Sequence, residues 1–336
     1  MTPLKLVAGF LSATFAMNLM AADFNFKFQS SDPSGVKNFH IQQEWAERVG
    51  KMTGGRVEIT ILPVGSVVSH TETLGAMKMG VLDGHVSVTG YFSGQDPAFG
   101  LIGNTVGAWS SPDQLYTYIN YGGGYELMNE LYKPYGVKFV GGGGTGLESF
   151  VSKKPLDGVE DLKGLKMRAP EGLVQSVFAA AGASPVNLPG SEVYTGLSKG
   201  VIDAADYTVF STNQSAGLNE VAPHPVYPGF HSLPLLEIAM NLKEWNELPE
   251  DIQAIMTTSA RDFAKDISTQ LAIADVKAVK EAREDPNITI HNWSDEERMK
   301  FREIARKQWK TYAEQSPNAE KVYKSVTQFL ESQGLL

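Results

Sequence analysis

Hydrophobic and polar residues alternate along the first part of the chain in strand-like and helix-like stretches. Residues 24–28 read Phe-Asn-Phe-Lys-Phe, the period-two pattern of a half-buried strand. Apolar residues then recur at helical spacing through 41–52, and a second alternating strand follows at 57–61. A short helix at 72–80 precedes another strand at 85–89. This order predicts a largely parallel sheet flanked by helices.

The same alternation returns in the middle of the chain. Helical patterns at 112–135 precede a strand at 137–140, and strands and helices alternate again through 147–209. The two halves exchange near residues 141–147 and again near 231–241. We therefore expect an α/β fold of two lobes joined by crossing strands. The expected division is lobe I at 23–145 with part of 232–270, and lobe II at 146–231.

The C-terminal part, residues 249–336, consists almost entirely of helix-forming stretches. Pro249 with two acidic residues after it is a favourable helix start, and that helix runs on until Pro286 stops it. Ser294 and Glu297 form a capping box for a further helix. Such long helices either brace both lobes or pair two chains into a homodimer, and we expect the brace.

The first 22 residues have the pattern of a secretory signal peptide. Lys5 is followed by an interrupted apolar run that ends at Met20, and two alanines close the segment. The run is too short and too broken for a permanent membrane span. A buried first helix is the alternative. We expect a soluble protein that is exported to the periplasm.

Composition narrows the classes of partner and chemistry. The 336 residues carry 38 acidic against 29 basic side chains, a formal net charge of -9, which disfavours nucleic acid as a partner. That charge does not exclude a small organic anion, because one buried arginine outweighs distant surface charge. The chain has no cysteine, which removes thiol catalysis, thiolate metal sites and disulfides.

Motifs of known enzyme classes are absent or out of context. The glycine-rich segment 141–146 matches the dinucleotide fingerprint, but the strand-like segment 147–151 follows where a helix is required. A flexible crossover beside a cleft accounts for these glycines better. The six histidines are scattered without a metal-ligand spacing. We therefore expect no enzyme, with an exported acid–base enzyme as the rival interpretation.

A few charged residues lie in apolar or strand-like surroundings. Arg168 ends a short strand, where its planar guanidinium could bind a carboxylate through two parallel hydrogen bonds or pair with a structural acid. Asp206, Glu237 and Glu148 are acids in similar contexts, and an unpaired carboxylate is costly there. Each acid is about as well explained by capping or solvation as by ligand binding.

Five segments resemble the solute receptors of tripartite ATP-independent periplasmic (TRAP) transporters, in order and spacing over essentially the whole mature chain. They are Gly-Val-Leu-Asp-Gly at 80–84, Lys-Met-Arg-Ala-Pro at 166–170, the stretch 197–206, Val-Tyr-Pro-Gly-Phe-His at 226–231 and Asn-Leu-Lys-Glu-Trp at 241–245. They look closest to the branch that binds 2-oxo and 2-hydroxy monocarboxylates.

The resemblance implies a periplasmic-binding-protein fold whose lobes close on the ligand and mark the receptor as loaded for the membrane subunits of the transporter. Arg168 falls at the family's arginine, which grips the ligand carboxylate. A bridging Na⁺ or Ca²⁺, as in sodium-dependent uptake, would be held by Glu148, Asp206, the carbonyl of Tyr207 and Glu237. We also expect Tyr91, Phe92, Tyr207 and Phe230 to line the ligand site, although each aromatic could be core.

The chain also departs from the oxo-acid branch. Where that branch has Gln, Glu and Trp, this chain has Glu148, Asp206 and Tyr207. The added negative charge could favour a divalent ion or a ligand with its own positive group. A dicarboxylate, a sugar acid or a zwitterion therefore remains an alternative substrate.

Overall fold

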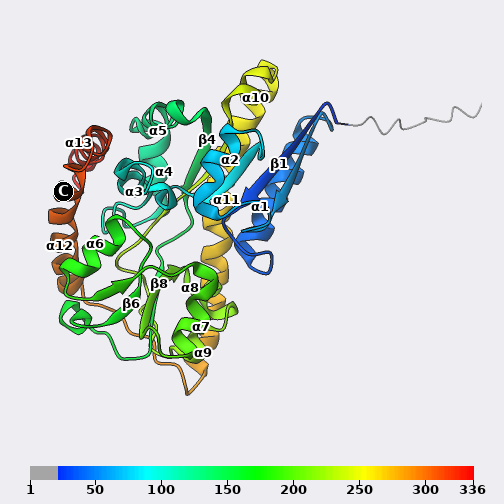
Figure 1. Cartoon of the computed structure of the whole chain (residues 1–336). Helices are drawn as coiled ribbons and strands as arrows, with labels where there is room; N and C mark the ends of the chain where they lie inside the picture. Colours follow the sequence, from blue (N-terminus) through cyan, green and yellow to red (C-terminus); the bar gives the residue numbers. More distant parts are fainter. Residues whose placement is uncertain (1–21) are drawn as a thin grey trace, which may run out of the picture.

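The computed structural model describes residues 22–336 as two lobes, each built on its own sheet (Figure 1). The predicted signal peptide lies outside the described residues except for its last position. The lobe I sheet has the order β2 (Val57–Leu62), β1 (Phe24–Ser30), β3 (Gly84–Val88), β9 (Leu235–Asn241), β4 (Val137–Gly144). The lobe II sheet has the order β5 (Ser149–Ser152), β8 (Ala204–Thr208), β6 (Lys166–Arg168), β7 (Ser184–Val186). The predicted α/β two-lobed fold is confirmed.

Lobe I follows directly from the alternation in its first strands. Strand β1 pairs in parallel with β2 and β3, and its inward residues Phe26 and Phe28 are buried. Helix α1 (Lys37–Met52) covers them with Trp45 and Val49, which lie four residues apart on one face. Strand β9 returns from lobe II and pairs antiparallel with both β3 and β4.

The glycines at 141–144 lie on β4, so the prediction of a flexible crossover is wrong for them, and the connection to β5 begins only at Thr145. A Cβ atom on Gly143 would lie 2.8 Å from the Cβ atom of Ala264, and one on Gly141 would lie 2.8 Å from that of Ala260. Both alanines belong to the long helix α11 (Glu250–Glu284). The glycines therefore let α11 pack closely against a buried strand.

Helix α11 extends along both lobes, as expected for a brace (Figure 1). Its 35 residues correspond to roughly 50 Å at the usual rise per residue. It contacts α1 and β4 in lobe I and α8 (Phe210–Ser215) in lobe II. On α11, Asp275 accepts a hydrogen bond of 2.7 Å from the backbone N–H of Ser211, at the start of α8.

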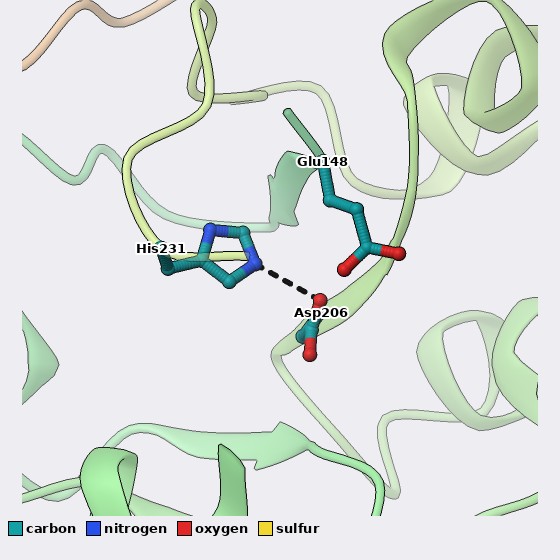
Figure 2. Close-up of side chains that lie close together, drawn as sticks. All are labelled: Glu148, Asp206 and His231. Atoms are coloured by element: carbon teal, nitrogen blue, oxygen red, sulfur yellow. Dashed lines mark hydrogen bonds and ion pairs between the residues drawn. The ribbon is translucent and has the colours of Figure 1, made fainter. Parts of the chain in front are cut away.

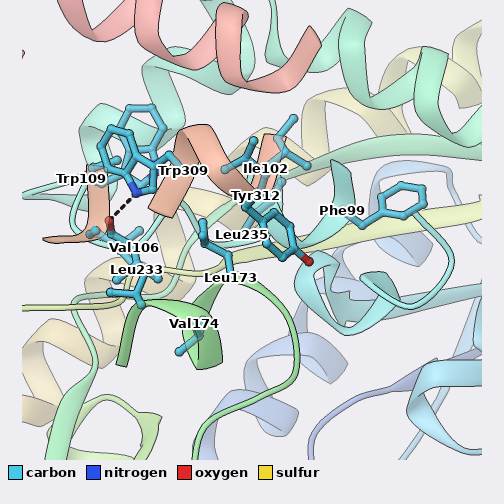
Figure 3. Packing of buried hydrophobic residues seen from close by; sticks show 14 of the residues in the cluster. Phe99, Ile102, Val106, Trp109, Leu173, Val174, Leu233, Leu235, Trp309 and Tyr312 are labelled. Carbon is cyan, nitrogen blue, oxygen red and sulfur yellow. Dashed lines mark hydrogen bonds between the residues drawn. The ribbon is translucent and has the colours of Figure 1, made fainter. Parts of the chain in front are cut away.

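Helices α12 (Asp295–Ala313) and α13 (Pro317–Ser332) cover the other side of the molecule. Figure 3 shows buried residues of α12 between α3 (Pro97–Gly103) of lobe I and α6 (Leu173–Ala180) of lobe II. Trp309 donates from its indole to the carbonyl of Val106 at 3.0 Å. Burial of each large side chain in this cluster contributes about 1.5–3 kcal/mol.

The remaining helices complete the two lobes. Those of lobe I are α2 (Thr73–Lys78), α4 (Pro112–Tyr121), α5 (Gly124–Tyr132) and α10 (Leu242–Glu247). Those of lobe II are α7 (Val193–Ser198) and α9 (Leu218–Val221). Among residues 22–336, no helix combines the length and apolarity that crossing a membrane requires.

Candidate functional site

A cleft opens between the two sheets and is lined by residues of both lobes. Polar groups of lobe I that line it are Asp32, Asn38, His70, Tyr91 and Asn104. Those of lobe II include Glu148, Arg168, Glu171, Asp206, Tyr207 and Thr212. Several of these residues lie at or just after the carboxyl ends of strands, the edge at which open α/β sheets bind ligands.

Arg168 is buried at the end of β6 and projects into the cleft, as the sequence predicted. Its Nε donates to the carbonyl of Leu188 at 3.0 Å, and its Nη1 donates to the carbonyl of Asp206 at 2.6 Å. Its guanidinium carbon lies 5.9 Å from the ring centroid of Tyr207. Within residues 22–336 it forms no salt bridge with an acid, so its charge is available to an anion.

Glu148, Asp206 and His231 form a buried cluster beside the cleft (Figure 2). They come from the crossover between β4 and β5, from β8, and from the segment before β9. One ligand atom from each lies within 4.8 Å of the other two, and His231 Nε2 is 2.9 Å from Asp206 Oδ1. Within the described chain, Asp206 Oδ2 and His231 Nδ1 are buried without a hydrogen-bond partner.

The surroundings shift the pKa values of the two carboxyl groups of this cluster in opposite directions. Burial and the charge of Asp206 raise the pKa of Glu148 well above its ordinary value. Burial acts to raise the pKa of Asp206 as well, but His231, Glu148 and Arg168 together hold it below its ordinary value. Of the two, Glu148 therefore holds its proton to the higher pH and Asp206 loses its proton first.

The chemistry of the cluster is better explained by a cation site than by a purely structural role in the core. Two carboxyl groups and an imidazole converge, and the unpartnered Asp206 Oδ2 is a buried acceptor that a cation would satisfy. Carboxylate oxygens suit Na⁺ or Ca²⁺, whereas the imidazole is a ligand that transition metals prefer. The cation would be held chiefly by the carboxylate oxygens.

Glu237 was expected in the metal set, but the structure does not bring it there. Side chains alternate along β9, so Leu236 lines the cleft and Glu237 points to the other face of the sheet. There its carboxylate meets His85 Nε2 at 3.0 Å and accepts from Thr89 Oγ1 at 2.6 Å and from the hydroxyl of Tyr132. This group is a closed polar network in the core of lobe I.

The four expected aromatic residues divide into two pairs. Tyr91 and Tyr207 line the cleft, and burial raises the pKa of Tyr207 to about 12. Phe92 stacks on His85 in the lobe I core with ring centroids 5.3 Å apart, and it does not line the cleft. Phe230 stacks on Trp293 at 3.7 Å beneath α12 and also lies outside the lining.

Sequence reasoning missed His231 and Asp32. His231 was counted among the scattered histidines, although its place in the apolar stretch that crosses back into lobe I was a usable signal. Asp32 was not singled out. Its position two residues after the parallel strand β1 was the informative feature, because parallel strands present ligand groups at their carboxyl ends.

A family model described as bacterial extracellular solute-binding protein, family 7, matches residues 31–316. The chain belongs to this family. A family relative, the monocarboxylate 2-oxoacid-binding periplasmic protein of Nostoc sp., is 34% identical over 237 residues. That alignment covers 70% of this chain, and the chain spans only 64% of the relative's own length.

Solved TRAP receptors have the same fold. An apo, open periplasmic solute-binding protein from Rhodobacter sphaeroides is 55% identical, with a TM-score of 0.78 over 93% of this chain and 99% of that one. A receptor from Colwellia psychrerythraea with bound calcium and pyruvate is 27% identical, with a TM-score of 0.82 over 93% of this chain and 95% of that one. The family resemblance inferred from the sequence is confirmed.

Proposed function

We propose that this protein is the extracytoplasmic receptor of a TRAP transporter and binds a small organic carboxylate between its lobes. The observation that carries this is the buried guanidinium of Arg168, held by two carbonyl groups and facing a cleft. Among residues 22–336 no acid makes a salt bridge with this guanidinium, and a ligand carboxylate would supply that contact. The carboxylate would receive two hydrogen bonds from the planar fork.

A cation at Glu148, Asp206 and His231 is the second part of the proposal. The related receptor with calcium and pyruvate supports a cation beside the carboxylate. In this chain the ligand set would be Glu148 and Asp206 with His231, and the carbonyl of Tyr207 stays a predicted ligand. Glu237 leaves the proposed set, because its oxygens are already satisfied in lobe I.

The lobes lie in an arrangement suited to a loaded receptor. Thr212 of lobe II donates to Asn38 of lobe I at 3.1 Å, and Ser93 of lobe I donates to the carbonyl of Glu171 of lobe II at 3.4 Å. The open relative superposes less well than the calcium–pyruvate receptor, although it shares twice the sequence identity. Both observations support capture by lobe closure.

The wider context follows from family membership. Export to the periplasm, hand-over of the ligand to membrane subunits and the absence of catalysis are expected of such a receptor. A homodimer through the C-terminal helices stays a prediction. An exported acid–base enzyme is the rival function. Incubation with candidate acids distinguishes the two, because a receptor returns the acid unchanged, whereas an enzyme converts it.

A thermal-shift screen of small organic acids tests the proposal. The panel should contain 2-oxo and 2-hydroxy monocarboxylates, dicarboxylates, sugar acids and amino acids, each with EDTA, Na⁺ or Ca²⁺. We expect at least one carboxylate to raise the melting temperature, because ligand at 100 times its Kd stabilises by about 2.7 kcal/mol. Stabilisation by none of the acids under any ion condition contradicts the proposal.

A further inference from the structure

The wall of the cleft that belongs to lobe I carries a carboxylate of its own. Asp32 lies two residues after the end of β1 and lines the cleft, whereas Arg168 lines it from lobe II. Neither the family match nor the proposed binding of a ligand carboxylate by Arg168 gives Asp32 a role. Within residues 22–336 it forms no salt bridge.

Asp32 is held in a fixed position by a dedicated partner. Gln42 of α1 is fully buried and donates from its amide to Asp32 Oδ2 at 2.8 Å. The amide oxygen of Gln42 has no hydrogen-bond partner among the described residues, so this buried amide serves the carboxylate alone. The backbone N–H of Asp32 donates to Ser30 Oγ at 2.8 Å, and its carbonyl accepts from Val64 at 3.0 Å. Gln42 thus fixes one carboxylate oxygen, and no group among the described residues donates to the other.

The groups around Asp32 do not neutralise it. Burial raises the pKa of Asp32 to about 6, with Gln42 opposing the shift, so the carboxylate is still mostly ionised at neutral pH. His70, which also lines the cleft, has its pKa lowered by burial and then by Arg168, and is therefore neutral there. The flanking hydroxyl groups of Tyr91 and Tyr207 carry no charge at that pH, because burial raises the pKa of each.

The cleft therefore presents one permanent cation and a surplus of acids. Arg168 takes the ligand carboxylate, and the cation site would satisfy Glu148 and Asp206. Asp32 lies on the opposite lobe from all three, with an oxygen that lacks a donor. A ligand that is only an anion would leave this carboxylate enclosed and uncompensated on closure.

We propose that Asp32 binds a positively charged or hydroxyl group at the far end of the ligand, so that the preferred substrate is a small carboxylate bearing an amino group. This rests on the proposed carboxylate receptor and names its substrate class. Ammonium binds best because it brings charge as well as a hydrogen-bond donor. A hydroxyl group supplies only the donor and ranks second, and an unsubstituted acid ranks last.

The test is isothermal titration calorimetry with a matched series of straight-chain acids. Carboxylates of three to five carbons are compared as unsubstituted, hydroxy and amino forms, with the substituent at each position from C2 to the terminus. The proteins are the full mature chain, Asp32→Asn and, as a control, Glu171→Gln. Glu171 is an exposed acid at the edge of the same cleft, so its variant removes equal charge and leaves the Asp32–Gln42 contact intact.

We expect an amino acid of this series to bind the unaltered receptor at least about tenfold more tightly than its unsubstituted counterpart. Asp32→Asn should abolish that preference and leave the affinity for the unsubstituted acid within about threefold, while Glu171→Gln keeps the preference. Equal or tighter binding of unsubstituted acids, or an unchanged preference in Asp32→Asn, overturns the inference and leaves the carboxylate receptor standing. Binding of none of the acids overturns both.

Discussion

The described residues contain two buried acid–histidine groups, which differ in whether every carboxylate oxygen has a partner. In lobe I, Glu237 meets His85, Thr89 and Tyr132 and lies on the face of the sheet away from the cleft. Beside the cleft, Asp206 pairs with His231 but keeps an oxygen without a partner. A buried carboxylate alone therefore does not identify a binding site. The unsatisfied atom facing a cavity is the informative feature, since its cost has to be met by something that binds.

Glu237→Gln should cause the largest loss of stability. The amide has only one acceptor oxygen, so at least one of the donors around it is left buried and unpaired, at a cost of about 2–4 kcal/mol in the free energy of unfolding. Chemical denaturation measures this. Affinity for the carboxylate ligand should stay within about twofold. A variant that loses affinity for the carboxylate ligand but keeps its free energy of unfolding would contradict the structural role and indicate that Glu237 belongs to the binding site.

Asp32→Asn should raise the free energy of unfolding, and only above about pH 4. The pKa of Asp32 rises from 3.8 to about 6 on folding, so the folded state holds its proton more tightly than the unfolded state does. The carboxylate therefore costs stability that is absent below about pH 4, grows between the two pKa values and is complete above about 6. Since Asp32 is half-buried, we expect the variant to be about 1–3 kcal/mol more stable at pH 7.5.

Denaturation curves at pH 3.5 and pH 7.5 check this expectation. The two proteins should have the same stability at the lower pH. A variant that is less stable than the unaltered protein at pH 7.5 would show that Asp32 is a structural acid, and would contradict a ligand-binding role for it.

Glu148→Gln should have the smallest effect on stability. Burial and Asp206 raise the pKa of Glu148 and favour its neutral form, so a neutral amide of the same shape should change the free energy of unfolding by about 1 kcal/mol or less. The cation should be affected instead, because a bound cation favours the ionised carboxylate of Glu148, whose charge an amide cannot supply. Any stabilisation by Ca²⁺ or Na⁺ in thermal shift should fall at least about tenfold in apparent affinity. An unchanged ion response would place the cation elsewhere.

Much of the fold could be predicted because its patterns are local. The phenylalanines of β1 and the helical spacing of Trp45 and Val49 depend only on neighbouring residues, and so does the proline stop after α11. Arg168 was found for a similar reason, since a cation at the end of a short strand, among apolar residues, requires an anionic or carbonyl partner.

The errors came from features that depend on distant parts of the chain. The choice between Leu236 and Glu237 for the cleft depends on which face of β9 meets lobe II, and a shift of one residue reverses it. The glycine run was judged flexible because its partner, α11, lies more than a hundred residues later. His231 meets Asp206 across 25 residues of chain, a contact that local patterns do not reveal.

The most direct test of the account compares Arg168→Ala with Lys166→Ala by calorimetry on the best carboxylate from the screen. Both residues lie on β6, but Lys166 is exposed and outside the cleft lining. Arg168→Ala should weaken binding by at least about tenfold to a hundredfold, because hydrogen bonds to a charged group are worth about 1.5–3 kcal/mol each. Lys166→Ala should change it less than twofold. Undiminished binding by folded Arg168→Ala would contradict the account.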